Sequence, residues 1–264
     1  MPHLHRVREL GANALVECSP AYLGRDPILL KRLSEASRLH LVTNTGYYGA
    51  ADDKSLPPHA FTETADQLAA RWTRECQEGI EDTGVRPGFI KIDVDPGRLS
   101  DVDGKLVKAA ARTHLATGLA IAAHATDRAS AMEELSILRE EGVDGSAFIW
   151  VHGHAESDTD FHIRAAGQKA WVEFDSVHLD TIHSHEKLVA AMRKHGRLGR
   201  VLISHNAGWY SVGRPHGGDF RSYDNLFTQF LPALKKAGLR ESEIRQLTVD
   251  NSREAFAIRV LRTC

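Results

Sequence analysis

The sequence has no apolar stretch long enough to cross a membrane, and its start, MPHLHRVREL, contains no apolar core of a signal peptide. It also has no block of lysine or arginine, and the formal net charge is only -2. These absences argue against nucleic acid or a membrane as a partner. Cysteine is scarce as well, with three residues in the chain: Cys18, Cys76 and Cys264. Their odd number and the lack of a CxxC spacing favour free thiols and a cytoplasmic protein.

Two nucleotide-binding motifs are absent too, since no GxGxxG follows the first apolar run and no P-loop occurs. What the chain does contain is a regular alternation of short apolar runs with amphipathic helical stretches. The runs are rich in Val, Ile, Leu or Phe without strict alternation, which is typical of parallel strands covered on both faces. They are ALVECS (14–19), HLVTNTGY (40–47), GFIKIDV (88–94), GLAIAAHA (118–125), AFIWVHG (147–153), AWVEFDSV (170–177) and RVLISHNA (200–207).

Repeated strand–helix units predict a parallel sheet with helices outside, either a closed barrel or an open doubly wound sheet. Because the nucleotide motifs are missing, we expect the barrel: one domain over residues 1–264 with a TIM-type (β/α) barrel fold. Only seven strands can be counted, and residues 3–10 have a helical pattern that Gly11 ends. The first strand of the barrel is therefore expected to be missing. After the last strand we expect a long loop, the stretch FTQFLPALKKAG and a final helix near SREAFAIRVL.

Polar residues mark the strand ends, where the chemistry of such barrels lies. In chain order they are Glu17, Thr45, Lys91 with Asp93, His124, His152 with His154, Asp175, and His205 with Asn206. A lysine inside FIKIDV is costly to bury unless it is neutralised or paired. With histidines ending the next two strands, the pattern favours a metal site, because imidazole is a common zinc ligand. For any single strand-end histidine, a core or loop role is the alternative. Six of the 15 histidines are set aside as surface or helix residues: His59, His114, His162, His183, His185 and His195.

Eight segments resemble the phosphotriesterase-like family of the amidohydrolase superfamily, from about residue 10 almost to the C-terminus. They are RELGANALVEC, LHLVTNTGYY, RPGFIKIDV, ATGLAIAAHA, FIWVH, AWVEFD, VLISHNAGWY and LTVDNSREAFA. The resemblance implies a metal-dependent hydrolase with one or two divalent ions, zinc by preference, in which Lys91 is carboxylated and bridges the metals. It places metal binding on His124 and His152 as well. His154 is the alternative to His152 as the metal ligand. His152 is favoured because it ends the segment FIWVH and Asp175 follows it 23 residues later.

The chain departs from the family pattern at three places. His3 and His5 spell the HxH of the family's first strand, but only eight residues separate His5 from Ala14, too few for a parallel crossover. The family's metal-binding and proton-accepting aspartate is Asn206 here, and an asparagine side chain cannot act as a general base. The family's proton-shuttle histidine is replaced by Ser176. Half of the metal site is therefore kept and half is not.

The leading functional hypothesis is hydrolysis of a lactone, carboxylic ester or phosphoester in a small-molecule substrate by a metal-activated water. The alternative is an impaired or inactive relative that keeps a partial metal site, and a third reading is an unrelated barrel without metal. Glycine-rich residues 208–225 suit a lid. Candidate substrate residues are Tyr47, Tyr48, Trp209, Tyr210 and Arg214; Arg214 and Arg221 are equally explained as solvated charges. Strands next to the missing one would have free edges, which predicts a homodimer.

Overall fold

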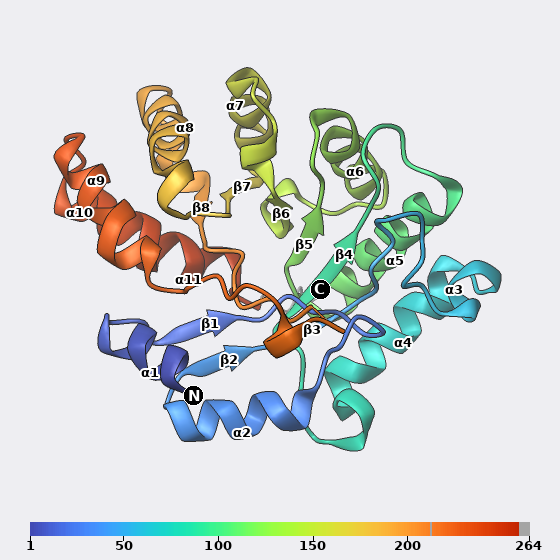
Figure 1. Cartoon of the computed structure of the whole chain (residues 1–264). Coiled ribbons are helices and arrows are strands. Elements are labelled where there is room, and N and C mark those ends of the chain that lie inside the picture. Colours follow the sequence, from blue (N-terminus) through green and yellow to red (C-terminus); the bar gives the residue numbers. More distant parts are fainter. Residues whose placement is uncertain (212, 259–264) are drawn as a thin grey trace.

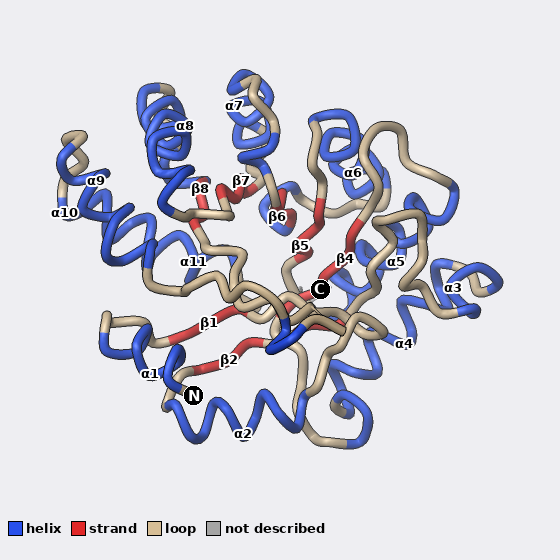
Figure 2. Tube along the Cα trace, in the orientation of Figure 1, coloured by secondary structure: helices blue, strands red, loops and turns tan. Residues whose placement is uncertain are grey.

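A computed structural model describes residues 1–211 and 213–258. Its strands lie at the centre and its helices surround them (Figures 1 and 2). The strands are β1 (Ala14–Val16), β2 (His40–Val42), β3 (Asn44–Thr45), β4 (Phe89–Asp93), β5 (Ile121–His124), β6 (Phe148–Val151), β7 (Trp171–Phe174) and β8 (Val201–Ile203). The helices are α1 (Pro2–Glu9), α2 (Pro27–Ser37), α3 (Pro58–Thr62), α4 (Ala65–Glu78), α5 (Asp101–Thr117), α6 (Arg128–Glu140), α7 (Thr159–Gly167), α8 (Ile182–Lys194), α9 (Leu231–Lys236), α10 (Glu241–Arg245) and α11 (Asn251–Ala255).

Every strand pair is parallel and follows chain order. β3 to β8 form one sheet in sequence, and β1 pairs with β2. Only Thr43 separates β2 from β3, so the two strands are consecutive parts of one predicted apolar run. All seven predicted apolar runs therefore contain a strand, and the α/β barrel-type fold is confirmed. The segment predicted as a helix before Gly11 is α1. Within the described residues, β1 pairs with β2 alone and β8 with β7 alone; we call the boundary between these two strands the seam.

Side chains alternate between two apolar layers along each strand, as the period of a β-strand requires. One layer packs inside the barrel and includes Phe89, Ala122 and Trp171. The other packs beneath the helices and includes Ile90 and Ile92. Lys91 and Asp93 follow Phe89 at intervals of two residues along β4. They therefore lie on the inner face of the barrel as well.

Helix caps fix the loops that leave the strand ends. The side chain of Asp127 begins α6 by accepting the backbone N–H of Ser130 at 2.9 Å. Its second oxygen accepts the N–H of Gly97 at 2.7 Å, which ties the loop after β4 to the loop after β5. Ser100 begins α5 with a capping box, and Gly118 ends it in the left-handed conformation that glycine adopts without strain.

At the seam, α1 packs Leu4 and Val7 against Leu39, with Tyr223 and Phe227 completing this cluster. The stretch FTQFLPALKKAG forms one wide helical turn over residues 226–230 followed by α9. The final helix is shorter than the sequence predicts: it ends at Ala255, because Phe256 turns inward to meet the Phe89 ring at 5.5 Å. The rest of SREAFAIRVL from residue 259 lies outside the described residues.

Cys18 and Cys76 are both free, as the sequence predicts, and Cys264 falls beyond the described part of the chain. No helix in the described ranges is long and apolar enough to cross a membrane.

Candidate metal centre and active site

The inner ends of β4 and β5 bring a lysine, a carboxylate and an imidazole together. Asp93 and His124 are partners in the strand register, and Lys91 pairs with Ala122 two residues earlier. The Nδ1 atom of His124 lies 3.5 Å from Oδ1 of Asp93. Burial, then the positive charges of Lys91 and His152, lowers the pKa of His124 to about 3. His124 is thus a neutral imidazole at physiological pH, and its lone pair is available to a metal ion.

Lys91 forms a buried ion pair with Asp93, two residues along the same strand. Its Nζ atom contacts Oδ1 of Asp93 and donates to the carbonyl of Ile92 at 3.2 Å. The two side chains are only 4% and 3% exposed. Oδ2 of Asp93 is buried and has no hydrogen-bond partner among the described residues. Burial raises the pKa of Asp93, although the neighbouring Lys91 works in the opposite direction.

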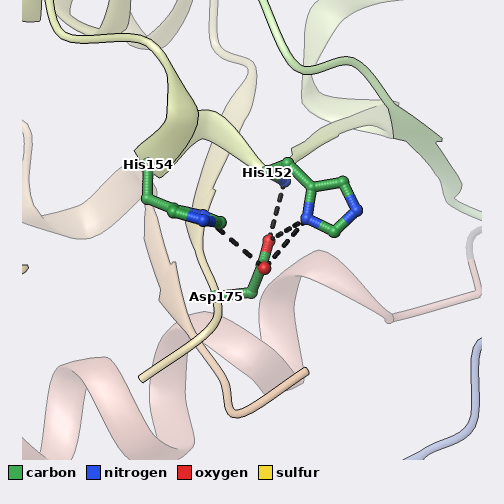
Figure 3. A group of neighbouring side chains, drawn as sticks. All are labelled: His152, His154 and Asp175. Carbon is green, nitrogen blue, oxygen red and sulfur yellow. Dashed lines mark hydrogen bonds and ion pairs between the residues drawn. The ribbon is translucent and has the colours of Figure 1, made fainter. Parts of the chain in front are cut away.

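The end of β6 presents His152 with its orientation fixed by Asp175. The backbone of His152 is left-handed, with φ 68°, and its N–H donates to Oδ2 of Asp175 at 2.8 Å. The Nδ1 atom of the ring lies 2.9 Å from Oδ1 and 2.8 Å from Oδ2 of the same carboxylate. Figure 3 shows that Nε2 of His152 points away from Asp175. Burial alone lowers the pKa of His152, but the hydrogen bond and charge of Asp175 outweigh it and raise that pKa.

His154 approaches the same carboxylate from the turn after β6 (Figure 3). Its Nδ1 atom is 3.5 Å from Oδ1 of Asp175. The ligand atoms of His152, His154 and Asp175 lie within 4.8 Å of one another, so this group is itself able to hold a metal ion. Asp175 is also fixed through its backbone, because its carbonyl lies 2.5 Å from Nε2 of His185 on α8.

The rings of His124 and His152 meet edge to face, with centroids 4.4 Å apart. Two imidazoles from neighbouring strands therefore converge beside the Lys91–Asp93 pair at one mouth of the barrel. His124 thus adds an imidazole beside His152, His154 and Asp175, the group among the described residues whose ligand atoms lie within 4.8 Å of one another, and imidazole and carboxylate are the ligands that a zinc-like ion prefers.

Comparison with known proteins shows which family the chain belongs to. The sequence profile of the phosphotriesterase family matches residues 1–256. This chain belongs to the phosphotriesterase family. The phosphotriesterase homology protein of Escherichia coli is 28% identical to it over 250 residues, covering 93% of this chain and 84% of that protein. An aryldialkylphosphatase of Saccharolobus solfataricus is 26% identical and covers 96% of this chain and 83% of its own length.

One further relative and one crystal structure extend the comparison. The N-acetyltaurine hydrolase of Dictyostelium discoideum is 24% identical, over 97% of this chain and 72% of that protein. A crystal structure of the Escherichia coli phosphotriesterase homology protein, complexed with phosphate in its active site, superposes with a TM-score of 0.88 at 24% identity. It covers 97% of this chain and 88% of that one, and it supports the barrel fold.

Asn206 follows β8, at the position where the resemblance implies a metal-binding aspartate. Asn206 has a left-handed backbone, φ 45°, and its amide lies 3.4 Å from Oδ1 of Asp175 and 3.4 Å from Oγ of Ser176. Its Oδ1 accepts the indole N–H of Trp209 at 3.0 Å. Both ends of the Asn206 amide are thus engaged, and neither takes up a proton. His3, of the N-terminal HxH, stacks on Phe220 with ring centroids 3.8 Å apart and takes no part in the site.

The two tyrosines predicted to bind substrate have different surroundings. Tyr48 lies next to the site, with its ring 6.2 Å from that of His124. Tyr47 is buried on the opposite side of the strand, where it meets Trp72 at 5.2 Å. Tyr47 therefore faces away from Tyr48, because neighbouring residues of an extended segment face opposite ways, and its role in substrate binding stays a prediction.

The loop residues among these candidates are far more exposed. Trp209 and Tyr210 are 60% and 73% exposed, and Arg214 is exposed too. Arg221 lies with its guanidinium 5.0 Å from the Trp209 ring centroid and donates to the Asn206 carbonyl at 3.2 Å. Arg221 therefore supports the loop rather than standing free as a solvated charge.

Two further residues beside the site, Glu173 and His185, were not predicted from the sequence. Glu173 is two residues before Asp175 on β7 and accepts a hydrogen bond from Ser204 at 2.7 Å. Burial, then the charge of Asp175, raises the pKa of Glu173 to about 7. The alternation in WVEFD could have indicated this residue, because it places Glu173 on the same face of the chain as Asp175. His185 was set aside as a helix residue, and no local pattern distinguishes it from the others.

Proposed function

We propose that the protein is a metal-dependent hydrolase of the phosphotriesterase/lactonase type that cleaves a lactone, carboxylic ester or phosphoester in a small-molecule substrate. The observation that carries the proposal is the convergence of His124 and His152, whose rings meet at 4.4 Å beside a buried carboxylate. A divalent cation held there, zinc by preference, would supply Lewis acidity and lower the pKa of bound water. A cytoplasmic location belongs to the same proposal.

The chain's own residues have separate tasks in this scheme. His124 and His152 hold the cation, and Asp175 keeps the His152 ring turned so that Nε2 is the free nitrogen. Tyr48 borders the site on the β3 side. Trp209 covers Asn206 from the loop and gives an apolar face to the mouth. The relatives' printed activities extend the substrate panel to an aryl phosphotriester and an N-acyl amide.

The second candidate function is metal binding with little or no turnover. Asn206 favours this function, because an amide at this position cannot act as a carboxylate base. The amide donates toward Asp175 and accepts from Trp209. Such a chain would still bind a cation and a substrate-like ligand, while proton removal from water would be slow.

Metal content and turnover measured on one preparation separate these functions. We expect the purified protein to contain zinc by elemental analysis and to hydrolyse at least one of a lactone, an aryl ester, an aryl phosphotriester and an N-acyl amide. His124→Ala and His152→Ala should lose both metal and activity, whereas His183→Ala, a change at an exposed helix residue, should lose neither. Bound zinc without turnover on any substrate would establish the second function. Absence of bound metal would refute both.

A further inference from the structure

A second group of possible cation ligands lies on the Nδ1 side of the His152 ring, opposite the nitrogen that points away from Asp175 (Figure 3). The ligand atoms of His152, His154 and Asp175 lie within 4.8 Å of one another. Nδ1 of His152 is 2.9 Å from Oδ1 of Asp175, and Nδ1 of His154 is 3.5 Å from the same oxygen. Around a tetrahedral zinc ion with bonds of about 2.0–2.2 Å, neighbouring ligand atoms lie about 3.4 Å apart. The observed separations lie on both sides of that value, so small ring rotations would place the three atoms around one ion.

The turn that carries both histidines is pressed against β7. Gly153 stands between them, and a Cβ added there would lie 2.8 Å from Cγ1 of Val172 and 3.1 Å from the carbonyl oxygen of Glu173. From α7, Nε2 of His162 lies 2.7 Å from the carbonyl oxygen of Gly153. A side chain at residue 153 would push the turn away from β7, and both rings away from Asp175 with it.

The ring of His154 has a nitrogen that no protein group satisfies. Its Nδ1 is buried and has no hydrogen-bond partner among the described residues, because 3.5 Å from Asp175 is too long for a hydrogen bond. Such an atom costs free energy, and a bound ion is one way to satisfy it. The ring also stacks on His185, with centroids 5.3 Å apart and 28° between the planes. This contact keeps the unsatisfied nitrogen facing the carboxylate.

We propose that His152, His154 and Asp175 bind a transition-metal ion such as zinc between β6 and β7, at a position separate from the one beside His124. Imidazole nitrogens suit zinc, whereas magnesium and calcium prefer oxygen ligands. On binding, the cation forms bonds to Nδ1 of both rings and to a carboxylate oxygen of Asp175. The hydrogen bond between His152 and Asp175 breaks, and the Nδ1 proton of His152 leaves to solvent as the cation takes its place.

The two cation positions oppose each other because they share one ring. Asp175 supports the first cation by holding His152, and loss of such a partner weakens a metal site about 10- to 100-fold. A second cation claims the same carboxylate and adds a like charge, so it should bind at least about tenfold more weakly than the first. It is therefore filled from added zinc and is not retained through purification. This order of filling rests on the proposed function, whereas the new position itself does not.

Isothermal titration calorimetry with zinc chloride tests the proposal without an activity assay. The unmodified protein should bind two zinc ions in two separate phases. His154→Phe removes the ligand nitrogen but keeps a ring against His185, and it should bind one ion in the first phase alone; His154→Ala should do the same. His183→Phe, at an exposed position of α8, is the matched control and should keep both phases. Magnesium chloride should produce no second phase. Circular dichroism and thermal melting establish that each variant is folded.

His124→Ala separates this proposal from the proposed function, since it should lose the first phase and still bind one ion. Zinc binding that is the same in both His154 variants as in the unmodified protein would overturn the new position. One ion that is lost in the His154 variants and kept in His124→Ala would refute the first position and support the new one. One ion that is lost in His124→Ala and kept in the His154 variants would do the reverse. No zinc binding in the unmodified protein would refute both.

Discussion

The ring nitrogen Nδ1 of His152 lies 2.8 Å from Oδ2 of Asp175, which also accepts the backbone N–H of His152 at 2.8 Å. One carboxylate therefore fixes both the backbone turn and the ring of the same histidine. Because Nδ1 is engaged, the ring presents Nε2 away from Asp175 before any cation is bound (Figure 3).

Asp175→Asn should weaken zinc binding by about 10- to 100-fold, the usual effect of removing the carboxylate behind a metal-binding histidine. The amide keeps the shape of the side chain but loses the charge that orients His152. Titration calorimetry measures the effect. Asp180→Asn is the control, because that carboxylate lies nearby in sequence and is 94% exposed. Equal affinity in both variants would show that Asp175 does not orient a ligand.

Asn206→Asp should raise hydrolysis of the best substrate by about tenfold or more, or raise zinc occupancy. A positioned base contributes roughly 10²- to 10⁴-fold, and a carboxylate adds ligand charge as well. Steady-state rates and elemental analysis of the variant and the unmodified protein decide the matter. Asn206→Ser, which adds no carboxylate, should produce neither gain. If the aspartate variant matches the parent in rate and metal content, residue 206 is not at the catalytic position.

Gly46→Ala should destabilise the fold by roughly 3 kcal/mol or more, in the range of severe backbone and packing changes. Gly46 has φ 121°, and an added Cβ would lie 1.9 Å from the carbonyl oxygen of Lys91. Gly11→Ala controls for the backbone conformation, since its φ is 102° but no atom lies within 4 Å of its Cβ position. Denaturant unfolding compares the two. Similar losses would mean that β3 moves away from Lys91 without cost.

Acid should destabilise the protein partly through His205, whose pKa burial lowers to about 4. The unfolded chain binds a proton near pH 6.5, whereas folded His205 stays neutral until about pH 4. Stability from this group is therefore full above pH 6.5 and is lost as the pH falls from 6.5 to 4. The loss is at most about 3 kcal/mol, at about 1.4 kcal/mol per pKa unit. His205→Phe should unfold with a flatter dependence in this window; an unchanged slope would contradict the prediction.

The seam predicts self-association. β1 and β8 each have one strand partner in the described ranges, and unpaired strand edges favour pairing with another chain. We expect a homodimer whose interface includes residues near the N-terminus and these two strands. Sedimentation velocity over a wide concentration range measures the association, and hydrogen exchange locates it. A monomer at all concentrations, with rapid exchange at residues 14–19, would rule it out.

The sequence predicted the repeating architecture well because parallel strands buried on both faces are continuous apolar runs. It also located Lys91, His124 and His152, because each ends or interrupts such a run. It could not predict that Asp93 pairs with Lys91, since a strand-end aspartate has the same pattern whether it faces a lysine or solvent. The sequence also did not show which of the two adjacent tyrosines, Tyr47 or Tyr48, lies beside His124, because this depends on the strand register.

The seam separates the residues of the site into two groups that differ in how firmly the sheet holds them. Lys91, Asp93, His124 and Asp175 lie on or directly after strands with neighbours on both sides, whereas Asn206 follows β8, which borders the seam. Thermal opening of the seam would therefore displace Asn206 and its loop while leaving the imidazoles and carboxylates in place. Under the proposed function, we therefore expect opening of the seam to change the fit of the substrate more than the affinity for the cation.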